Sequence, residues 1–143
     1  MGIVGSNSGM QPWQDESFAS YSVLVYAEYI GGLDEDQKEG LAAWNTADTR
    51  KLKNLPYTPV NRAYYDFASP IMYQQVVYSL GKAVLFRMEE ILGEKEFHGV
   101  VREYVHRNAF TNADPLSFFD VLFAYAGTDN LELNELVEAA FDL

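Results

Sequence analysis

The 143-residue sequence contains no cysteine, which excludes disulfide bonds, thiolate metal sites and cysteine nucleophiles. Positive charge is also scarce. The 10 lysine and arginine residues stand against 21 aspartate and glutamate residues, so the formal net charge is −11 at pH 7. This balance argues against a phosphate-binding surface, and we therefore expect no nucleic-acid partner.

Long apolar segments are missing as well. No run approaches the roughly 20 residues that a membrane-spanning helix needs. The N-terminus lacks the basic region and apolar stretch of a signal peptide. We expect no membrane segment, and the cellular compartment stays open.

Apolar residues make up 48% of the chain and aromatic residues 15%, which is enough for one packed domain over residues 1–143. Apolar spacing predicts helices over residues 13–30, 73–92, 97–105, 115–126 and 133–141, with a short helix within residues 33–53. Residues 1–11 and 54–70 are expected to be irregular. No stretch shows the two-residue alternation of a strand, so the expected fold class is all-α, a helical bundle or a solenoid-like stack.

Several helix ends carry specific signals. Gly31 and Gly32 should end the first helix, and Gly93 the one that starts at residue 73. Asp114 is expected to cap the helix over 115–126, with Pro115 at its first position. Leu116, Phe119, Phe123 and Ala126 should face the core of the domain.

Glu16 is the first candidate for chemistry. At helical spacing it shares a face with Ala19, Val23, Ala27 and Ile30, so this carboxylate stands on an otherwise apolar face. A buried carboxylate needs a cation or a metal ion to remain charged. Acidic residues also favour the first turn of a helix for electrostatic reasons alone. The residues by themselves leave both interpretations open.

Tyr73 and Tyr78 are the second candidates. They stand at the start of an apolar helix near Gly81, where a substrate backbone has room to approach, and a phenol can donate to a developing oxyanion. Packing at the edge of the core also explains such tyrosines.

His98 and His106 lack the spacing of a zinc pair. Four acids, Glu89, Glu90, Glu94 and Glu96, are expected to form a solvated helix end. No serine lies in a recognisable nucleophile motif.

Two segments carry a resemblance to a known family. PWQDESFASY at residues 12–21 resembles the WLNEGFAxY-type segment of the zinc aminopeptidases with a thermolysin-like (gluzincin) catalytic domain, the alanyl aminopeptidase and leukotriene hydrolase family. YSLGKAVL at residues 78–85, with EILG at 90–93, resembles the family's YxKG helix. The next helix in the family is of the F-x6-Y type, which matches Phe97 to Tyr104 here. The resemblance spans roughly residues 2–126 in order.

The resemblance implies roles for three residues. Glu16 falls on the family's third zinc ligand, Tyr78 on the tyrosine that stabilises the tetrahedral intermediate, and Tyr73 on a second tyrosine that some members carry upstream. Leu80 replaces the lysine that precedes the family's glycine. The HExxH motif, whose histidines bind zinc and whose glutamate is the general base, is absent. Residues 2–5, GIVG, resemble the segment on the C-terminal side of that motif, so the motif is expected just upstream of Met1.

The sequence therefore predicts the C-terminal part of a zinc metallopeptidase catalytic domain that acts on peptides, of which the aminopeptidase type is the most specific prediction. Zinc is expected in the parent protein and not in the isolated chain, which should be inactive. The exposed half-site is expected to favour self-association. A non-catalytic helical interaction module is the alternative. An HExxH motif encoded upstream would decide for the peptidase.

Overall fold

The structure is a computed structural model that describes residues 3–32, 34–36 and 58–143. The predicted all-α fold class is confirmed. The described helices are α1 (Trp13–Tyr29), η1 (Tyr64–Asp66), α3 (Pro70–Tyr73), η2 (Gln74–Leu80), α4 (Gly81–Leu92), α5 (Glu94–Asn108), α6 (Ser117–Ala126) and α7 (Leu131–Ala140). Within these ranges β-pairing is limited to two isolated bridges that tie Val4 to Ala109 and Gly5 to Asn112.

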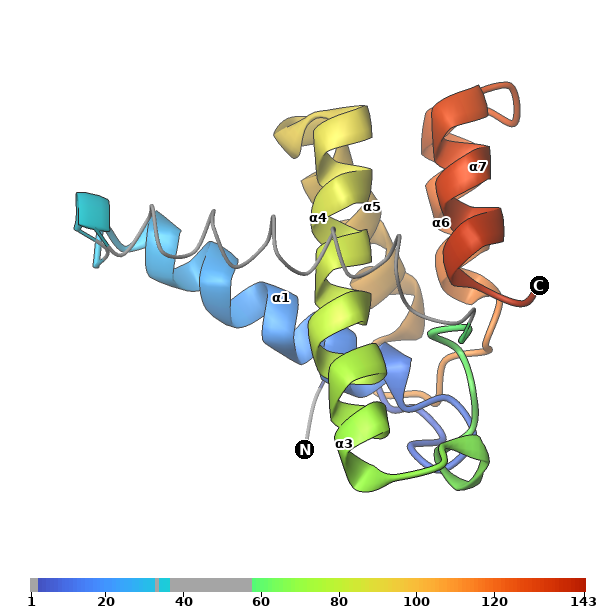
Figure 1. Cartoon of the computed structure of the whole chain (residues 1–143). Helices are drawn as coiled ribbons and strands as arrows, with labels where there is room; N and C mark the ends of the chain where they lie inside the picture. Colours follow the sequence, from blue (N-terminus) through green and yellow to red (C-terminus); the bar gives the residue numbers. More distant parts are fainter. Residues whose placement is uncertain (1–2, 33, 37–57) are drawn as a thin grey trace.

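α4 lies at the centre of this arrangement. α1, α5 and α7 all pack against it, and α6 packs against α5. Figure 1 shows α1 on one side of α4 and α7 on the other, with the outer half of α1 projecting beyond the other described helices. No described helix has both the length and the apolar character needed to cross a bilayer.

An aromatic cluster around Trp13 forms much of the core. Trp13 is fully buried, and its ring centroid lies 5.0 Å from that of Phe141 and 5.6 Å from that of Phe119. Phe118 adds an edge-on contact at 5.9 Å. Because these rings come from the start of α1, from α6 and from the end of the chain, their burial fixes the N-terminal end of α1 against the C-terminal helices.

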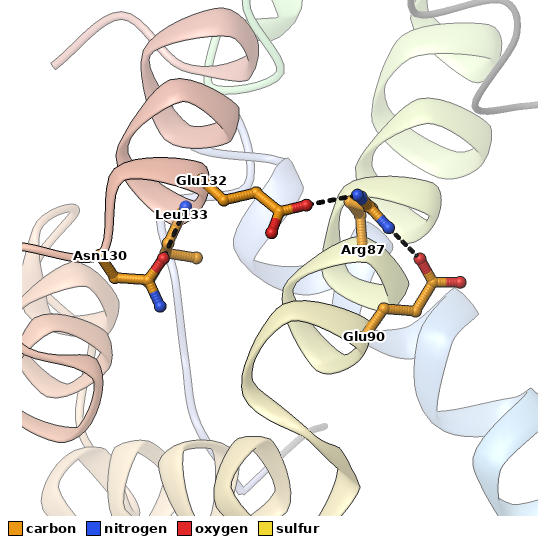
Figure 2. Close-up of polar contacts among 5 residues, drawn as sticks. All are labelled: Arg87, Glu90, Asn130, Glu132 and Leu133. Carbon is orange, nitrogen blue, oxygen red and sulfur yellow. Dashed lines mark hydrogen bonds and ion pairs between the residues drawn. The ribbon is translucent and has the colours of Figure 1, made fainter.

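A surface ion pair joins α4 to α7, as Figure 2 shows. The Arg87 guanidinium donates to Glu90 on its own helix and to Glu132 on α7, each at 2.6 Å. Asn130 caps α7 by accepting a hydrogen bond from the Leu133 amide at 3.1 Å. Since the ion-pair side chains are 41% to 65% exposed, this link contributes little beyond the apolar packing.

Several predicted boundaries need correction. The helix expected from residue 73 begins at Pro70, because the Ser69 hydroxyl accepts a hydrogen bond from the Met72 amide and caps it. α6 begins at Ser117 instead of Pro115, since Asp114 accepts from the Leu116 amide and forms a turn before the helix. Leu116 was expected to face the core and is 51% exposed. The helix predicted within residues 33–53 lies almost wholly outside the described residues.

The apolar face predicted for α1 is also different in the structure. Val23 is 64% exposed and Ile30 is 56% exposed, so the face that carries Glu16 does not pack on the described core. The buried residues of α1 are instead Trp13, Gln14, Ser17 and Tyr21. Apolar residues lie on all sides of this helix, a pattern typical of helices that are covered on more than one face.

Candidate active-site half

Glu16 lies in the first turn of α1 and is half-buried. No lysine or arginine among the described residues forms an ion pair with it. Its neighbour is the hydroxyl of Tyr78 on η2, which lies close enough for the Glu16 carboxylate to raise the pKa of the phenol. The structure thus brings together a carboxylate and a phenol that stand 62 positions apart in the sequence, 78 − 16.

The two tyrosines predicted as site residues are in contact. The ring centroids of Tyr73 and Tyr78 are 5.8 Å apart in an edge-on arrangement. Burial raises the pKa of Tyr78, and the neighbouring Glu16 carboxylate raises it further. Burial and the charge of Glu16 also raise the pKa of Tyr73. Phenols are protonated at neutral pH even without such a shift, so both residues can act as hydrogen-bond donors, and the raised pKa values extend this to more alkaline pH.

A close contact between α1 and η2 explains why Glu16 meets Tyr78. The Ser17 hydroxyl donates to the Val77 carbonyl at 2.6 Å, so the adjacent residues on the two helices, Glu16 and Tyr78, are held side by side. Gly81 allows the approach. A Cβ atom built there would overlap the Ser17 hydroxyl and lie 2.8 Å from Ser17 Cβ and 3.2 Å from Val60 Cγ1. Gly81 is buried by this helix contact, so the expectation that a substrate backbone approaches it is wrong.

The backbone around Tyr78 has an unusual form. η2 is a π-helix of seven residues, inserted between α3 and α4 in one continuous rod that is visible in Figure 1. π-Helical segments are rare and occur often at functional sites. The wider register rotates the later side chains relative to an α-helix, and Ser17 supplies a hydrogen bond to the Val77 carbonyl inside this segment.

An aromatic chain extends from the site. Tyr73 makes edge-on contacts with Tyr64 at 5.0 Å and with Phe67 at 5.4 Å between ring centroids. Tyr64 in turn contacts Tyr65 at 5.9 Å. Tyr64, Tyr65 and Phe67 lie within the segment expected to be irregular and held by aromatic side chains, and their rings support Tyr73.

The histidines and the other acids lie away from Tyr78. His106 is exposed, but His98 is 31% exposed, and its Nε2 is buried without a hydrogen-bond partner. Glu89 was expected to be solvated and instead accepts a hydrogen bond from the Tyr21 hydroxyl at 2.7 Å. Among the described residues, no group of three or more histidine, cysteine, aspartate or glutamate side chains is arranged to hold a metal ion.

Ser17 is the residue of this site that sequence patterns missed. Its neighbours Glu16 and Tyr78 were selected for their own chemistry, whereas Ser17 acts by holding two helices together. The signal available was the pair of small residues, Ser17 and Gly81, in two segments that both belong to the family resemblance. Small residues at matching positions permit close helix contact.

A family model described as "Peptidase family M1 domain" matches residues 3–139. The chain belongs to peptidase family M1. Comparisons with the curated proteins and with the solved structures found no significant match. The matched range contains Glu16, Tyr73 and Tyr78, and it confirms the predicted relationship to the metallopeptidases of this family. The roles of these three residues in the M1 chain remain predictions.

Proposed function

We propose that this M1 chain supplies one half of a zinc site that hydrolyses peptides in the manner of an aminopeptidase. Glu16 acts as a zinc ligand and Tyr78 as the donor to the oxyanion. The observation that carries the proposal is the position of the Glu16 carboxylate, which is half-buried, has no cationic partner among the described residues and lies beside the Tyr78 hydroxyl.

Of the protein ligands that a zinc ion would need, this chain supplies only one, Glu16. Protein zinc sites of the catalytic type use three protein ligands, such as two histidines and one glutamate. The described residues gather no such set, and the 143-residue sequence contains no HExxH motif. Two histidines from outside this sequence would complete the ligands. When bound, zinc in such a site polarises the peptide carbonyl and lowers the pKa of a water molecule.

Tyr78 supplies the chemistry that this chain contributes directly. A tyrosine is protonated at neutral pH even with its ordinary pKa of about 10, and burial raises the pKa of Tyr78 further. The hydroxyl can therefore donate a hydrogen bond to the oxygen of the attacked carbonyl as negative charge develops there. Tyr73 contacts both the ring and the hydroxyl of Tyr78. It orients Tyr78 and limits the access of water to its hydroxyl.

We expect an HExxH motif encoded in frame upstream of Met1, and its absence would contradict the proposal. The protein that includes this motif, called the extended protein, is the one to assay. We expect the extended protein to bind zinc and hydrolyse peptides. Glu16→Gln should lose bound zinc and activity together. Tyr78→Phe should retain zinc and lose about 10²- to 10³-fold in kcat, as removal of one oxyanion donor does. Glu135→Gln, an exposed change on α7, is the matched control and should leave both unchanged.

The 143-residue chain provides the complementary measurement. It should bind no stoichiometric zinc and hydrolyse no peptide. Zinc-dependent hydrolysis by this chain alone, or a Tyr78→Phe enzyme with normal kcat, would contradict the proposal.

One observation favours the second candidate function, a non-catalytic interaction module. Tyr26 and Tyr29 on α1 are 64% and 87% exposed, and apolar side chains so exposed are typical of contact surfaces. A native start codon at Met1, with normal cellular abundance of the 143-residue chain, would favour this function over the peptidase.

A further inference from the structure

A series of tyrosine rings runs from Tyr78 to the surface. Tyr78 and Tyr73 are half-buried, with ring centroids 5.8 Å apart. Tyr73 contacts Tyr64 at 5.0 Å, and Tyr64 contacts Tyr65 at 5.9 Å. Exposure rises along the series to 49% at Tyr64 and 77% at Tyr65. We call Tyr64 and Tyr65 the aromatic platform, because both present a large part of their side chains to solvent.

The platform is held in place before any ligand arrives. The Tyr64 amide donates to the Gly9 carbonyl at 2.8 Å, which ties η1 to the loop before α1. A Cβ atom built on Gly9 would lie 2.9 Å from the Tyr65 hydroxyl, so this hydroxyl packs against the glycine. Figure 1 shows η1 and α3 at the same end of the molecule. Because these residues are already ordered, a ligand that covers them loses little of its binding energy to ordering the protein.

Packing within the domain does not account for the exposed rings. Neither Tyr64 nor Tyr65 belongs to the core of the described structure. Surface tyrosines are enriched where other molecules bind, since their rings offer apolar area. Arg62 and Asp66 are the charged residues of segment 58–67 and have opposite signs, so this segment has no net charge. The platform therefore suits an apolar or aromatic ligand group better than a charged one.

The distance to Tyr78 relates the platform to the proposed reaction. Two ring contacts separate Tyr64 from Tyr78, a span that an extended peptide covers in about three residues. A peptide whose carbonyl oxygen accepts from Tyr78 is therefore long enough to place a neighbouring side chain on Tyr64.

We propose that Tyr64 is a specificity-determining residue, whose ring binds an aromatic or large apolar side chain of the peptide substrate close to the scissile bond. The inference rests on the proposed function, because it names the substrate class of the same site. Tyr64 lies outside the two segments, 12–21 and 78–93, that carry the family resemblance.

The first test uses the 143-residue chain without zinc. NMR titrations with N-acetyl-phenylalanine amide, N-acetyl-alanine amide and N-acetyl-lysine amide measure binding of single side chains. We expect the phenylalanine probe to shift the ring signals of Tyr64 and Tyr73, with a Kd on the order of millimolar. The alanine and lysine probes should bind at least about fivefold more weakly.

Matched variants locate this binding. Tyr64→Ala should raise the Kd of the phenylalanine probe about threefold to tenfold, since it removes an aromatic contact. Tyr64→Phe keeps the ring and should stay within about twofold of the wild type. Tyr125→Ala is the control, because Tyr125 on α6 is exposed to a similar extent, 46%, and should also stay within about twofold. Equal affinity for the phenylalanine and alanine probes, tighter binding of the lysine probe, or equal effects of Tyr64→Ala and Tyr125→Ala would overturn the role of Tyr64.

The second test measures kcat/KM of the extended protein for peptides with phenylalanine or alanine beside the scissile bond. Tyr64→Ala should lower the ratio of the two values about threefold to tenfold, mainly through KM, and should leave bound zinc and hydrolysis of the alanine peptide unchanged. If the extended protein lacks zinc or activity, the proposed function fails. If it is active and Tyr64→Ala keeps the wild-type preference, only the role of Tyr64 fails.

Discussion

Tyr21 and Tyr104 are buried to nearly the same extent, at 3% and 2% exposed, but their hydroxyls have different surroundings. The Tyr21 hydroxyl donates to the Glu89 carboxylate at 2.7 Å. The Tyr104 hydroxyl has no hydrogen-bond partner in the described structure. A phenylalanine in place of either tyrosine removes one oxygen atom and keeps the ring, so the two positions isolate the effect of the hydrogen bond.

Tyr21→Phe should lower the free energy of unfolding by about 1.5 to 3 kcal/mol, because it removes a hydrogen bond to a charged group. Tyr104→Phe should leave it unchanged or raise it by up to about 1 kcal/mol, because an unpaired polar group is removed. Urea denaturation of the two variants and the wild type measures both values. A larger loss for Tyr104→Phe than for Tyr21→Phe would show that the Tyr104 hydroxyl is bonded in solution.

At the scale of single residues, the sequence identified candidate residues by their chemical type. It gave wrong surroundings where a distant residue forms the contact. Glu16 was selected as a lone carboxylate on an apolar face, and Tyr73 and Tyr78 as phenols that could donate to an oxyanion. The family resemblance covers all three, and the structure brings them together. Glu89 looked solvated, since its run of acids resembles a helix end. Its partner Tyr21 lies 68 positions away, which no local pattern reveals.

At the scale of the helices, the contact between Gly81 and Ser17 determines how closely α1 approaches the rod of η2 and α4. Gly81→Ala should lower the free energy of unfolding by about 1 to 3 kcal/mol, since the added methyl group overlaps a buried neighbouring helix and outweighs the gain in helix propensity. Thermal unfolding measures this change. Under the proposed roles of Glu16 and Tyr78, the same variant of a protein that includes the HExxH motif should have a lower kcat, because separation of the helices would move Glu16 away from Tyr78.

Gly99→Ala is the control for this substitution. Gly99 also lies inside a helix, but an added Cβ would meet Cε1 of Tyr125 at 3.0 Å, and Tyr125 is 46% exposed and can move. This variant should be neutral or more stable by up to about 1 kcal/mol. Equal destabilisation by both changes would mean that backbone flexibility and not helix contact governs the effect at Gly81.

The presence of most helices could be predicted from the sequence, but their exact ends and the π-helical form of η2 could not. Apolar spacing predicted helices over residues 13–30, 73–92 and 97–105, and the structure has helices α1, α4 and α5 within or around these ranges, at residues 13–29, 81–92 and 94–108. The π-helical form of η2 was not predicted, because the apolar spacing of residues 74–80 is also compatible with an α-helix. The start of α6 was missed because Asp114 and Pro115 can open a helix or a turn, and the turn that precedes Ser117 prevails.

For the whole molecule, apolar spacing predicted the all-α class but not how the helices are placed. Helical periods without any two-residue alternation led to a helical domain, which the structure confirms. The projection of α1 beyond the other described helices in Figure 1 was not predicted, because the apolar face expected for this helix, which includes Val23 and Ile30, is exposed in the structure. The exposure of Tyr26 and Tyr29 on the same helix also became visible only in three dimensions.

Alkaline pH tests the packing of this tyrosine-rich molecule as a whole. Burial raises the pKa of Tyr104 to about 12, with a smaller contribution from the Asp15 carboxylate. In the unfolded chain a tyrosine has a pKa of about 10. The stability that neutral Tyr104 contributes is therefore fully present below about pH 10 and is lost as the pH rises towards 12, because the unfolded chain releases the proton first. Burial raises the pKa of Tyr21 and Tyr78 in the same direction.

We expect the free energy of unfolding of the wild type to fall steeply above about pH 10, with Tyr104 contributing up to about 1.4 kcal/mol per pH unit. Tyr104→Phe should show a shallower decline, so its advantage over the wild type grows between about pH 9 and about pH 11.5. Tyr29→Phe, which removes an 87% exposed phenol, should follow the wild-type curve. Urea denaturation across this pH range measures the slopes. Parallel curves for the wild type and Tyr104→Phe would mean that the Tyr104 ring opens to water before the domain unfolds.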